Sequence, residues 1–202
     1  MDDFYYSIAR SATVEIKVKG SRFIAEAKAA ESAEDAREIL KSIRKKGHAA
    51  THHCYAYRIG RADKQEFKYS DDGEPSGTAG KPIYECLSGR ELTNTIVVVT
   101  RYFGGTKLGT GGLARAYVDA AKQALEKAGK KTTFITDPLN LQFDLKYYDQ
   151  VVKLLSKFSA EQIKSDFSEM AQLKVAIRKS KTKELIETLT NLTNGQIKIS
   201  TK

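Results

Sequence analysis

Hydrophobic periodicity predicts a mixed α/β first part of the chain. Apolar residues that alternate with polar ones, or run together between turn residues, are typical of strands, whereas apolar residues three or four positions apart are typical of helices. The predicted strands are residues 14–18 and 21–29, which form a hairpin, and residues 51–59 and 95–103. The predicted helices run between Ser32 and Gly47, from Lys81 over a short stretch, and from 113 to 129. The strand at 95–103 is apolar on both faces, which indicates the centre of a sheet.

The rest of the chain predicts a second, smaller α/β unit. The predicted strands are 139–145, 161–168, 172–178 and 196–200, and the predicted helices are 147–157 and 181–192. This βαββαβ order is the ferredoxin-like pattern. A boundary is predicted near residues 129–138, because Gly129 ends a helix and polar residues lead to Pro138. We therefore expect an α+β protein of two domains, 1–133 and 134–202.

Charge and composition narrow the class of protein. The chain of 202 residues has 34 Lys or Arg and 25 Asp or Glu, a net charge of +9. Residues 1–133 hold 23 basic and 17 acidic residues (+6) and residues 134–202 hold 11 and 8 (+3), so there is no basic tail. A positive balance favours a polyanionic partner such as RNA. The chain has no apolar run near the roughly 20 residues of a membrane span, no secretory signal and two cysteines, so we expect a cytoplasmic protein without membrane contact.

A glycine-rich loop follows the central strand and precedes a helix. Nine of the 14 glycines lie between Gly73 and Gly112. A strand that leads through glycines into a helix presents free N–H groups and the positive end of a helix dipole to an anion. The loop matches neither the Walker A nor the GxGxxG pattern. Its glycines are also suited to tight strand–helix packing, but the flanking basic residues favour an anion contact. The candidate anion- or nucleic-acid-binding residues are Arg101, Gly104, Gly105, Lys107, Gly109, Gly111, Gly112, Arg115, Lys81 and His53.

Three carboxylates gather in a second loop, at Asp71, Asp72 and Glu74. They are suited to three roles: ligating a hard cation, pairing with Lys81, Arg101 or Lys107, or shaping turns. The spacing does not match an EF-hand. We favour pairing between the loops or turn shaping over a metal site, and we expect neither a metal nor a cofactor.

Residues 51–59 also carry candidate chemistry, at His52, His53 and Cys54. Zinc would need further ligands, because strand neighbours point to opposite faces and no CxxC or HExxH is present. A Cys54 nucleophile would need His52 or His48 as its base. His53, Tyr55 and Tyr57 share one face, which is suited either to stacking bases or to a half-buried aromatic core. No catalytic residue is predicted.

Three long motifs resemble one known family. HCYAY (53–57), SDDGEPSGTAGKPI (70–83) and VVVTRYFGGTKLGTGGLARAY (97–117), with KGSRFIA (19–25), are similar to the IMPACT/YigZ family. The resemblance covers nearly the whole chain. It implies a first domain with the two-layer fold of ribonuclease PH and a ribosomal protein domain, and a second domain like the last domain of elongation factor G. In eukaryotes, members of the family regulate translation by competing for an activator of a kinase that phosphorylates an initiation factor.

Two functions follow as hypotheses. The first is a cytosolic, non-catalytic protein that binds RNA or the ribosome and regulates translation, with a possible protein partner. The alternative is a hydrolase or phosphate-ligand enzyme that uses the acidic loop 71–74, with Asp72 or Glu74 as acid, base or metal ligand, and the glycine-rich loop 104–112.

Overall fold

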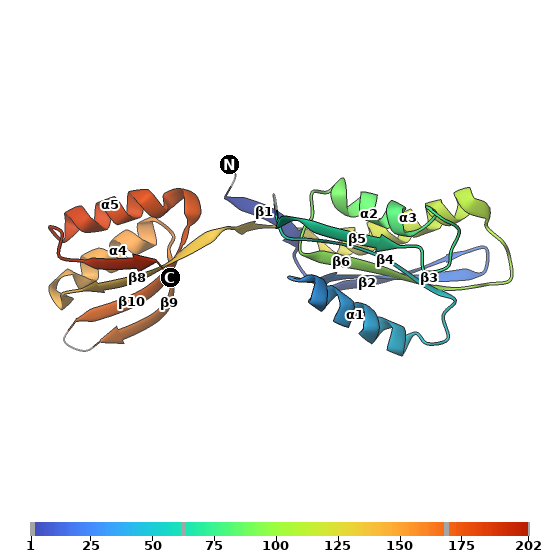
Figure 1. Cartoon of the computed structure of the whole chain (residues 1–202), viewed down its shortest axis with the longest axis horizontal. Helices are drawn as coiled ribbons and strands as arrows, with labels where there is room; N and C mark the ends of the chain where they lie inside the picture. Colours follow the sequence, from blue (N-terminus) through green and yellow to red (C-terminus); the bar gives the residue numbers. More distant parts are fainter. Residues whose placement is uncertain (1–2, 62–63, 168–169, 202) are drawn as a thin grey trace. The chain divides into compact units, whose positions relative to one another are not determined.

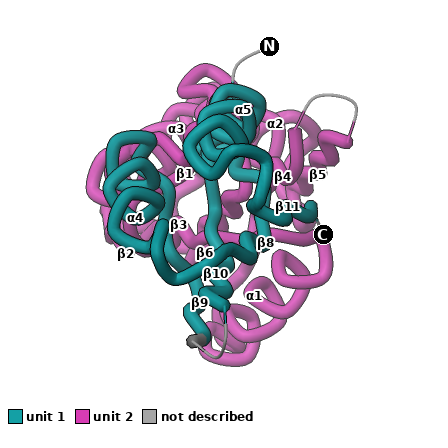
Figure 2. The backbone as a smooth tube through the Cα atoms, turned by 90° about the vertical axis from the view of Figure 1, so that its left-hand side faces the viewer, with its two compact units in different colours: residues 1–4, 134–202 teal, residues 5–133 magenta. Residues whose placement is uncertain are grey.

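The chain forms two compact units in the computed structural model, which describes residues 3–61, 64–167 and 170–201 (Figure 1). Residues 5–133 form one unit, and residues 134–201 form the other together with Asp3 and Phe4 (Figure 2). The division along the chain therefore falls between Thr133 and Phe134. Each unit has its own buried hydrophobic core.

The unit of residues 5–133 is built on a five-stranded antiparallel sheet with the order β2-β3-β6-β4-β5. Its strands are β2 (Ala12–Val18), β3 (Ser21–Ala29), β4 (His52–Ile59), β5 (Glu66–Ser70) and β6 (Thr95–Tyr102). The hairpin prediction is confirmed: Lys19 and Gly20 both have positive φ, as a two-residue type I′ turn requires. The central-strand prediction is also confirmed, since every residue of β6 but the last is buried. Strand β5 was not predicted, because most of its residues are exposed and its pattern is largely polar.

Three helices cover both faces of this sheet. They are α1 (Ala33–Lys46), α2 (Gly80–Ser88) and α3 (Gly109–Ala128). Helices α2 and α3 lie on one face and α1 lies on the other (Figure 1). The α+β class is as predicted, but the unit has three layers where two were expected. The side chains of β6 are apolar on both faces of the sheet, so both faces must be covered by helices.

The ends of the helices test the local predictions. Ser32 caps α1 as predicted, and its hydroxyl and the Asp35 carboxylate form a capping box. Helix α2 begins at Gly80, one residue before the predicted start. Helix α3 begins at Gly109, four residues before the predicted start, so the last glycines of the loop form the first turn of the helix.

The unit of residues 134–201 has a four-stranded antiparallel sheet with the order β11-β8-β10-β9. Its elements are β8 (Thr136–Phe143), α4 (Tyr148–Lys157), β9 (Glu161–Phe167), β10 (Ala171–Arg178), α5 (Thr182–Leu192) and β11 (Lys198–Thr201), with 3-10 turns η2 (Leu145–Tyr147) and η3 (Lys179–Lys181). The predicted βαββαβ order is confirmed; position 168, which ended one predicted strand, lies outside the described residues. Inward-facing residues such as Leu141, Leu173 and Val175 pack against Val151 and Leu185 of the two helices.

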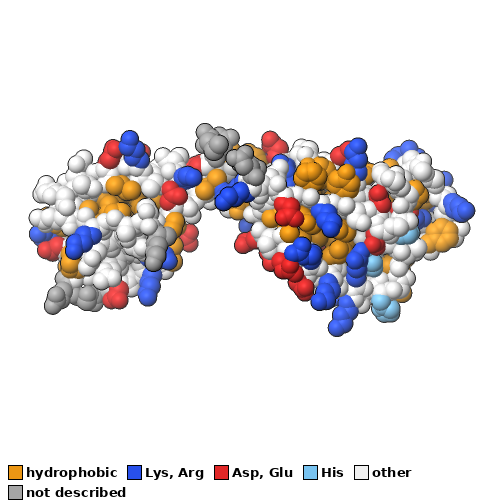
Figure 3. Space-filling model, viewed as in Figure 1, with side chains coloured by type: hydrophobic (Ala, Val, Ile, Leu, Met, Phe, Trp, Pro, Cys, Tyr) orange, Lys and Arg blue, Asp and Glu red, His pale blue; other side chains and the backbone are white. Residues whose placement is uncertain are grey.

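A two-stranded sheet pairs β1 (Phe4–Ile8) with β7 (Lys130–Phe134). Neither strand was predicted, and the residues of β7 were interpreted as part of a polar connection at 129–138. Within the described part of the chain, no helix is long and apolar enough to cross a bilayer. On the face shown in Figure 3, lysine and arginine side chains are spread over both units.

Candidate anion-binding cavity

The central strand β6 leads through residues 103–108 to the opening of α3, and a cavity of about 390 Å³ lies there. Leu108 is the N-cap of α3 and makes no side-chain capping hydrogen bond, and the first turn holds no acidic residue. Such an end leaves backbone N–H groups and a positive dipole end available to a ligand. The cavity is lined by Thr51, His52, Glu74, Pro75, Arg101, Phe103, Lys107, Leu108, Gly109, Thr110 and Leu113.

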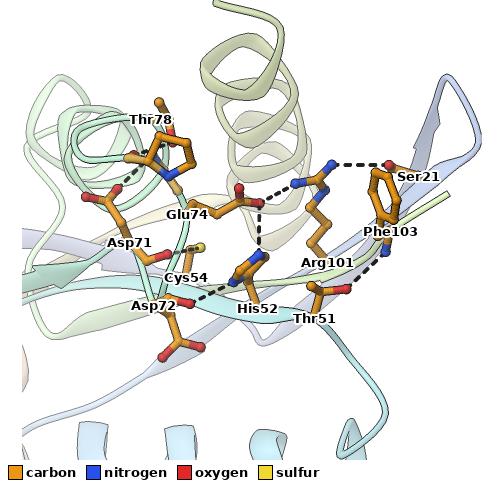
Figure 4. Close-up of polar contacts among 12 residues, drawn as sticks. Ser21, Thr51, His52, Cys54, Asp71, Asp72, Glu74, Thr78, Arg101 and Phe103 are labelled. Carbon is orange, nitrogen blue, oxygen red and sulfur yellow. Dashed lines mark hydrogen bonds and ion pairs between the residues drawn. The ribbon is translucent and has the colours of Figure 1, made fainter. Parts of the chain in front are cut away.

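Glu74 is the buried acid of the cavity wall, with 3% of its side chain exposed. Its Oε1 accepts a hydrogen bond from Arg101 Nη1 at 2.6 Å (Figure 4). The same oxygen accepts another from the Tyr117 hydroxyl at 2.8 Å. The Nε2 atom of His52 lies 3.9 Å from the same oxygen. Burial raises the pKa of Tyr117, so its hydroxyl stays protonated and donates. Glu74 thus joins the acidic loop, β6 and α3.

Arg101 is the buried base of the same wall, with 7% of its side chain exposed. Besides the bond to Glu74, its Nη2 lies 3.4 Å from the Ser21 hydroxyl oxygen. Its guanidinium carbon lies 5.6 Å from the centre of the Phe103 ring. Among the described residues, none accepts a hydrogen bond from Arg101 Nε, so the guanidinium keeps an unused donor.

The ring of His52 is fixed by the backbone of the acidic loop. Its Nδ1 lies 2.8 Å from the carbonyl oxygen of Asp72, and a carbonyl only accepts, so Nδ1 donates. The opposite nitrogen, Nε2, therefore turns toward Glu74 (Figure 4). His52 thus joins Glu74, Arg101 and Lys107 as an ionisable side chain of the cavity lining.

The other two acids of the loop point elsewhere. Asp71 accepts hydrogen bonds from the N–H groups of Gly77, Ala79 and Gly80 at 2.8–2.9 Å, at the opening of α2. Burial alone would raise the pKa of Asp71, but these three donors together lower it. Asp72 pairs with Arg44 of α1. Of the three acids, only Glu74 lines the cavity, and its partner Arg101 is one of the three basic residues that were predicted to pair with this loop.

Cys54 lies beneath the loop as a buried thiol. Its Sγ donates to the carbonyl oxygen of Asp71 at 2.9 Å, and burial raises the pKa of the thiol to about 12. A thiol that stays protonated at neutral pH is a poor nucleophile, so the geometry does not support a catalytic cysteine. The described residues contain no group of three His, Cys, Asp or Glu side chains that could hold a metal.

The glycines of the predicted loop have different roles. Gly104 packs against the backbone of Gly20: a side chain there would place its Cβ 1.9 Å from the Gly20 carbonyl carbon. Gly105 and Gly109 have positive φ and open space around them. Gly111 and Gly112 belong to the first turn of α3 and do not line the cavity. Close packing therefore explains Gly104, and the anion-binding prediction keeps its geometric basis at Gly109.

Three other predicted residues lie away from the cavity lining. His53 faces the α1 side of the sheet, where it is buried and its Nδ1 lies 3.1 Å from the Thr100 hydroxyl. Lys81 and Arg115 are exposed on α2 and α3. Sequence reasoning missed Phe103 and Tyr117. The aromatic pair Tyr102-Phe103 directly before two glycines is the one local signal that pointed to a side chain at the strand exit.

The structure defines an α+β protein of two units with a cavity at the N-terminus of α3, and comparison with known proteins gives its family. Residues 19–125 match the Impact N-terminal domain, and residues 141–196 match a domain of unknown function, DUF1949. The chain belongs to the IMPACT family.

Relatives match over nearly the whole length. The chain is 36% identical over 194 residues to the IMPACT family member YvyE of Bacillus subtilis (strain 168), covering 95% of this chain and 88% of that one. It is 34% identical over 192 residues to the IMPACT family member YigZ of Escherichia coli (strain K12), covering 95% and 94%. A crystal structure described as that of a hypothetical protein is 32% identical, covers 98% of this chain and 97% of that one, and has a TM-score of 0.70.

Proposed function

We propose that this protein binds RNA or the ribosome without catalysing a reaction, and that it acts in the control of translation in the cytoplasm. Membership of the IMPACT family supports the link to translation, because the family resemblance implies such a role for its eukaryotic members. The same resemblance favours a protein partner in that control. The net charge of +9 agrees with a polyanionic target.

The observation that carries the proposal is the uncapped opening of α3 beside Lys107 and Arg101. The charge of Arg101 is largely balanced by Glu74 at 2.6 Å. Among the described residues, no acidic side chain forms an ion pair with Lys107. The positive groups of the lining that no described acidic side chain balances are therefore Lys107 and the N-terminus of α3, which together suit a phosphate group.

A carboxylate placed in the first turn of α3 tests this proposal. Thr110→Glu would occupy the helix opening with the protein's own negative charge, and it would also stabilise the helix. We expect the variant to melt at or above the wild-type temperature and to lose binding to RNA and to ribosomes in low salt. Lys41→Gln, an exposed change on α1, serves as the control and should bind like the wild type. Undiminished binding by Thr110→Glu would remove the cavity from the proposal.

A phosphate-ligand enzyme is the second candidate, and one observation favours it. Glu74 and His52 line the same cavity as the helix opening, and ionisable groups that converge in a pocket are typical of active sites. Asp72 does not share this role, because its carboxylate binds Arg44 and the N–H of His53.

Turnover separates the two candidates. Purified protein is assayed against phosphoester and dipeptide panels with divalent metals, alongside Glu74→Gln and His52→Gln. The enzyme hypothesis predicts activity that both substitutions reduce at least about a hundredfold. Activity that both variants retain in full would come from a contaminant and not from this cavity.

A further inference from the structure

We propose that the cavity at the opening of α3 takes one unpaired nucleotide of a single-stranded RNA, with its phosphate at the helix opening and its base against Phe103. This inference rests on the proposed function and specifies the form of RNA that the site recognises. Phe103 lines the cavity but has no role in binding a phosphate alone, and here it stacks on the base.

The volume and shape of the cavity favour a single nucleotide. At about 390 Å³, the cavity lies near the lower end of pockets for small organic ligands, which span about 300–1,000 Å³. A recess of this size admits one base turned out of a strand. It does not admit a base pair, whose edges are held between two backbones. The concave site therefore selects unpaired RNA over duplex.

Phe103 presents an aromatic surface at this recess. The residue is 50% exposed, although covering an apolar ring is favourable in free energy. The backbone beneath the ring is fixed, since the Phe103 N–H donates to the Thr51 hydroxyl at 3.2 Å and Gly104 packs on Gly20. A base that stacks on a held aromatic ring loses little further conformational freedom.

The remaining lining residues match the other parts of a nucleotide. Leu108, Leu113 and Pro75 supply apolar contact for a base or sugar. Lys107 and the N–H groups at the opening of α3 supply the phosphate contacts. A nucleotide carries a phosphate and a planar base. The cavity offers Lys107 and backbone N–H groups to the phosphate, and the ring of Phe103 to the base.

The test compares Phe103→Leu with a matched control. Phe67→Leu removes another exposed phenyl ring of the same unit, 52% exposed, on β5 and away from the cavity lining. Fluorescence anisotropy measures binding of a labelled unstructured RNA and of a duplex of the same length. We expect the wild type and Phe67→Leu to prefer the single strand, and Phe103→Leu to bind it at least about fivefold more weakly.

Competition by small ligands separates stacking from charge. A 5′-mononucleotide should displace the RNA at lower concentration than inorganic phosphate does in the wild type. In Phe103→Leu the two competitors should become equal, whereas in Lys107→Gln both should weaken. Thermal unfolding of each variant checks that the fold is unchanged.

Each outcome separates the inference from the proposed function. No binding by the wild type to RNA or to ribosomes in low salt would end both. RNA binding that Lys107→Gln weakens and Phe103→Leu leaves intact, or equal binding of duplex and single strand, would overturn the nucleotide pocket and leave the phosphate contact standing.

Discussion

Glu74 and Arg101 form a buried pair, and its energetics differ from those of the exposed pairs on the same unit. Two buried charges are no longer solvated and stabilise each other, so removing one leaves the other buried without compensation. The exposed pair of Arg90 and Glu126 keeps its water, with side chains 30% and 66% exposed. The same chemical change therefore has different consequences at the two arginines.

The first prediction compares these two pairs. Arg101→Met should lower the free energy of unfolding by about 3–5 kcal/mol, because the Glu74 carboxylate stays buried without its cation. Arg90→Met should lower it by no more than about 1 kcal/mol. Urea denaturation of both variants measures the difference, and equal losses would contradict the buried-pair account.

The second prediction concerns Cys54. Since the pKa of its thiol is raised to about 12, native protein should leave Cys54 unmodified by iodoacetamide at pH 8, and modification should become appreciable only as the pH nears that value. Protein unfolded in denaturant serves as the control and should be alkylated at once. Mass spectrometry locates the modified residue. Fast alkylation of native Cys54 would reopen the nucleophile hypothesis.

Local pattern predicted some site residues and not others. Arg101 and Lys107 lie at the cavity because strand, loop and helix follow one another directly in sequence. The pattern placed His53 in the predicted set without showing which face of β4 meets α3. The bond from Tyr117 to Glu74 joins positions 43 residues apart, and no local spacing encodes it.

Helix α2 shows how the acidic loop acts at the scale of an element. Its N-cap residue, Ala79, has no side chain able to cap, so the first N–H groups depend on Asp71, which lies before the turn. A residue with a side chain at position 80 would place its Cβ 2.6 Å from the backbone of Ser70, so glycine is required there. The start of α2 therefore depends on the acidic loop for its cap and on Gly80 for close packing against Ser70.

The third prediction follows from that cap and from pH. Asp71→Ala should cost about 1–2 kcal/mol at pH 7, as the loss of a helix cap does. The folded pKa of Asp71 lies below its ordinary value of 3.8, so its stabilisation is complete above that pH and is lost as the pH falls through the folded pKa. Asp71→Asn should therefore show a smaller loss of stability between pH 5 and pH 2 than the wild type. Identical acid curves would contradict the assigned role.

Elements with a clear period were predictable, and edge elements were not. Strand β6, helix α3 and the βαββαβ order of the second unit could be predicted because each buries a regular apolar set. Strand β5 is mostly exposed at the edge of its sheet. Strand β7 is mostly exposed and polar, so its sequence carries little of the apolar signal.

For the whole molecule, the total charge of +9 does not by itself define a binding site, because it is spread over both parts of the chain. Both parts of the chain are basic, +6 over residues 1–133 and +3 over residues 134–202, which favours general attraction to a polyanion. Binding at a defined place needs a site that concentrates this attraction, and we propose that Lys107, which lines the cavity at the opening of α3, provides it. The central claim is that a phosphate of RNA occupies this position.

The salt dependence of RNA binding tests that claim most directly. Each phosphate neutralised on a single strand contributes about 0.7 to the slope of log affinity against log salt. We predict a steep fall in wild-type affinity with salt, a slope shallower by about 0.7–1 for Lys107→Gln, and a wild-type slope for Lys41→Gln. Salt-independent binding, or one slope shared by all three proteins, would contradict a phosphate contact at Lys107.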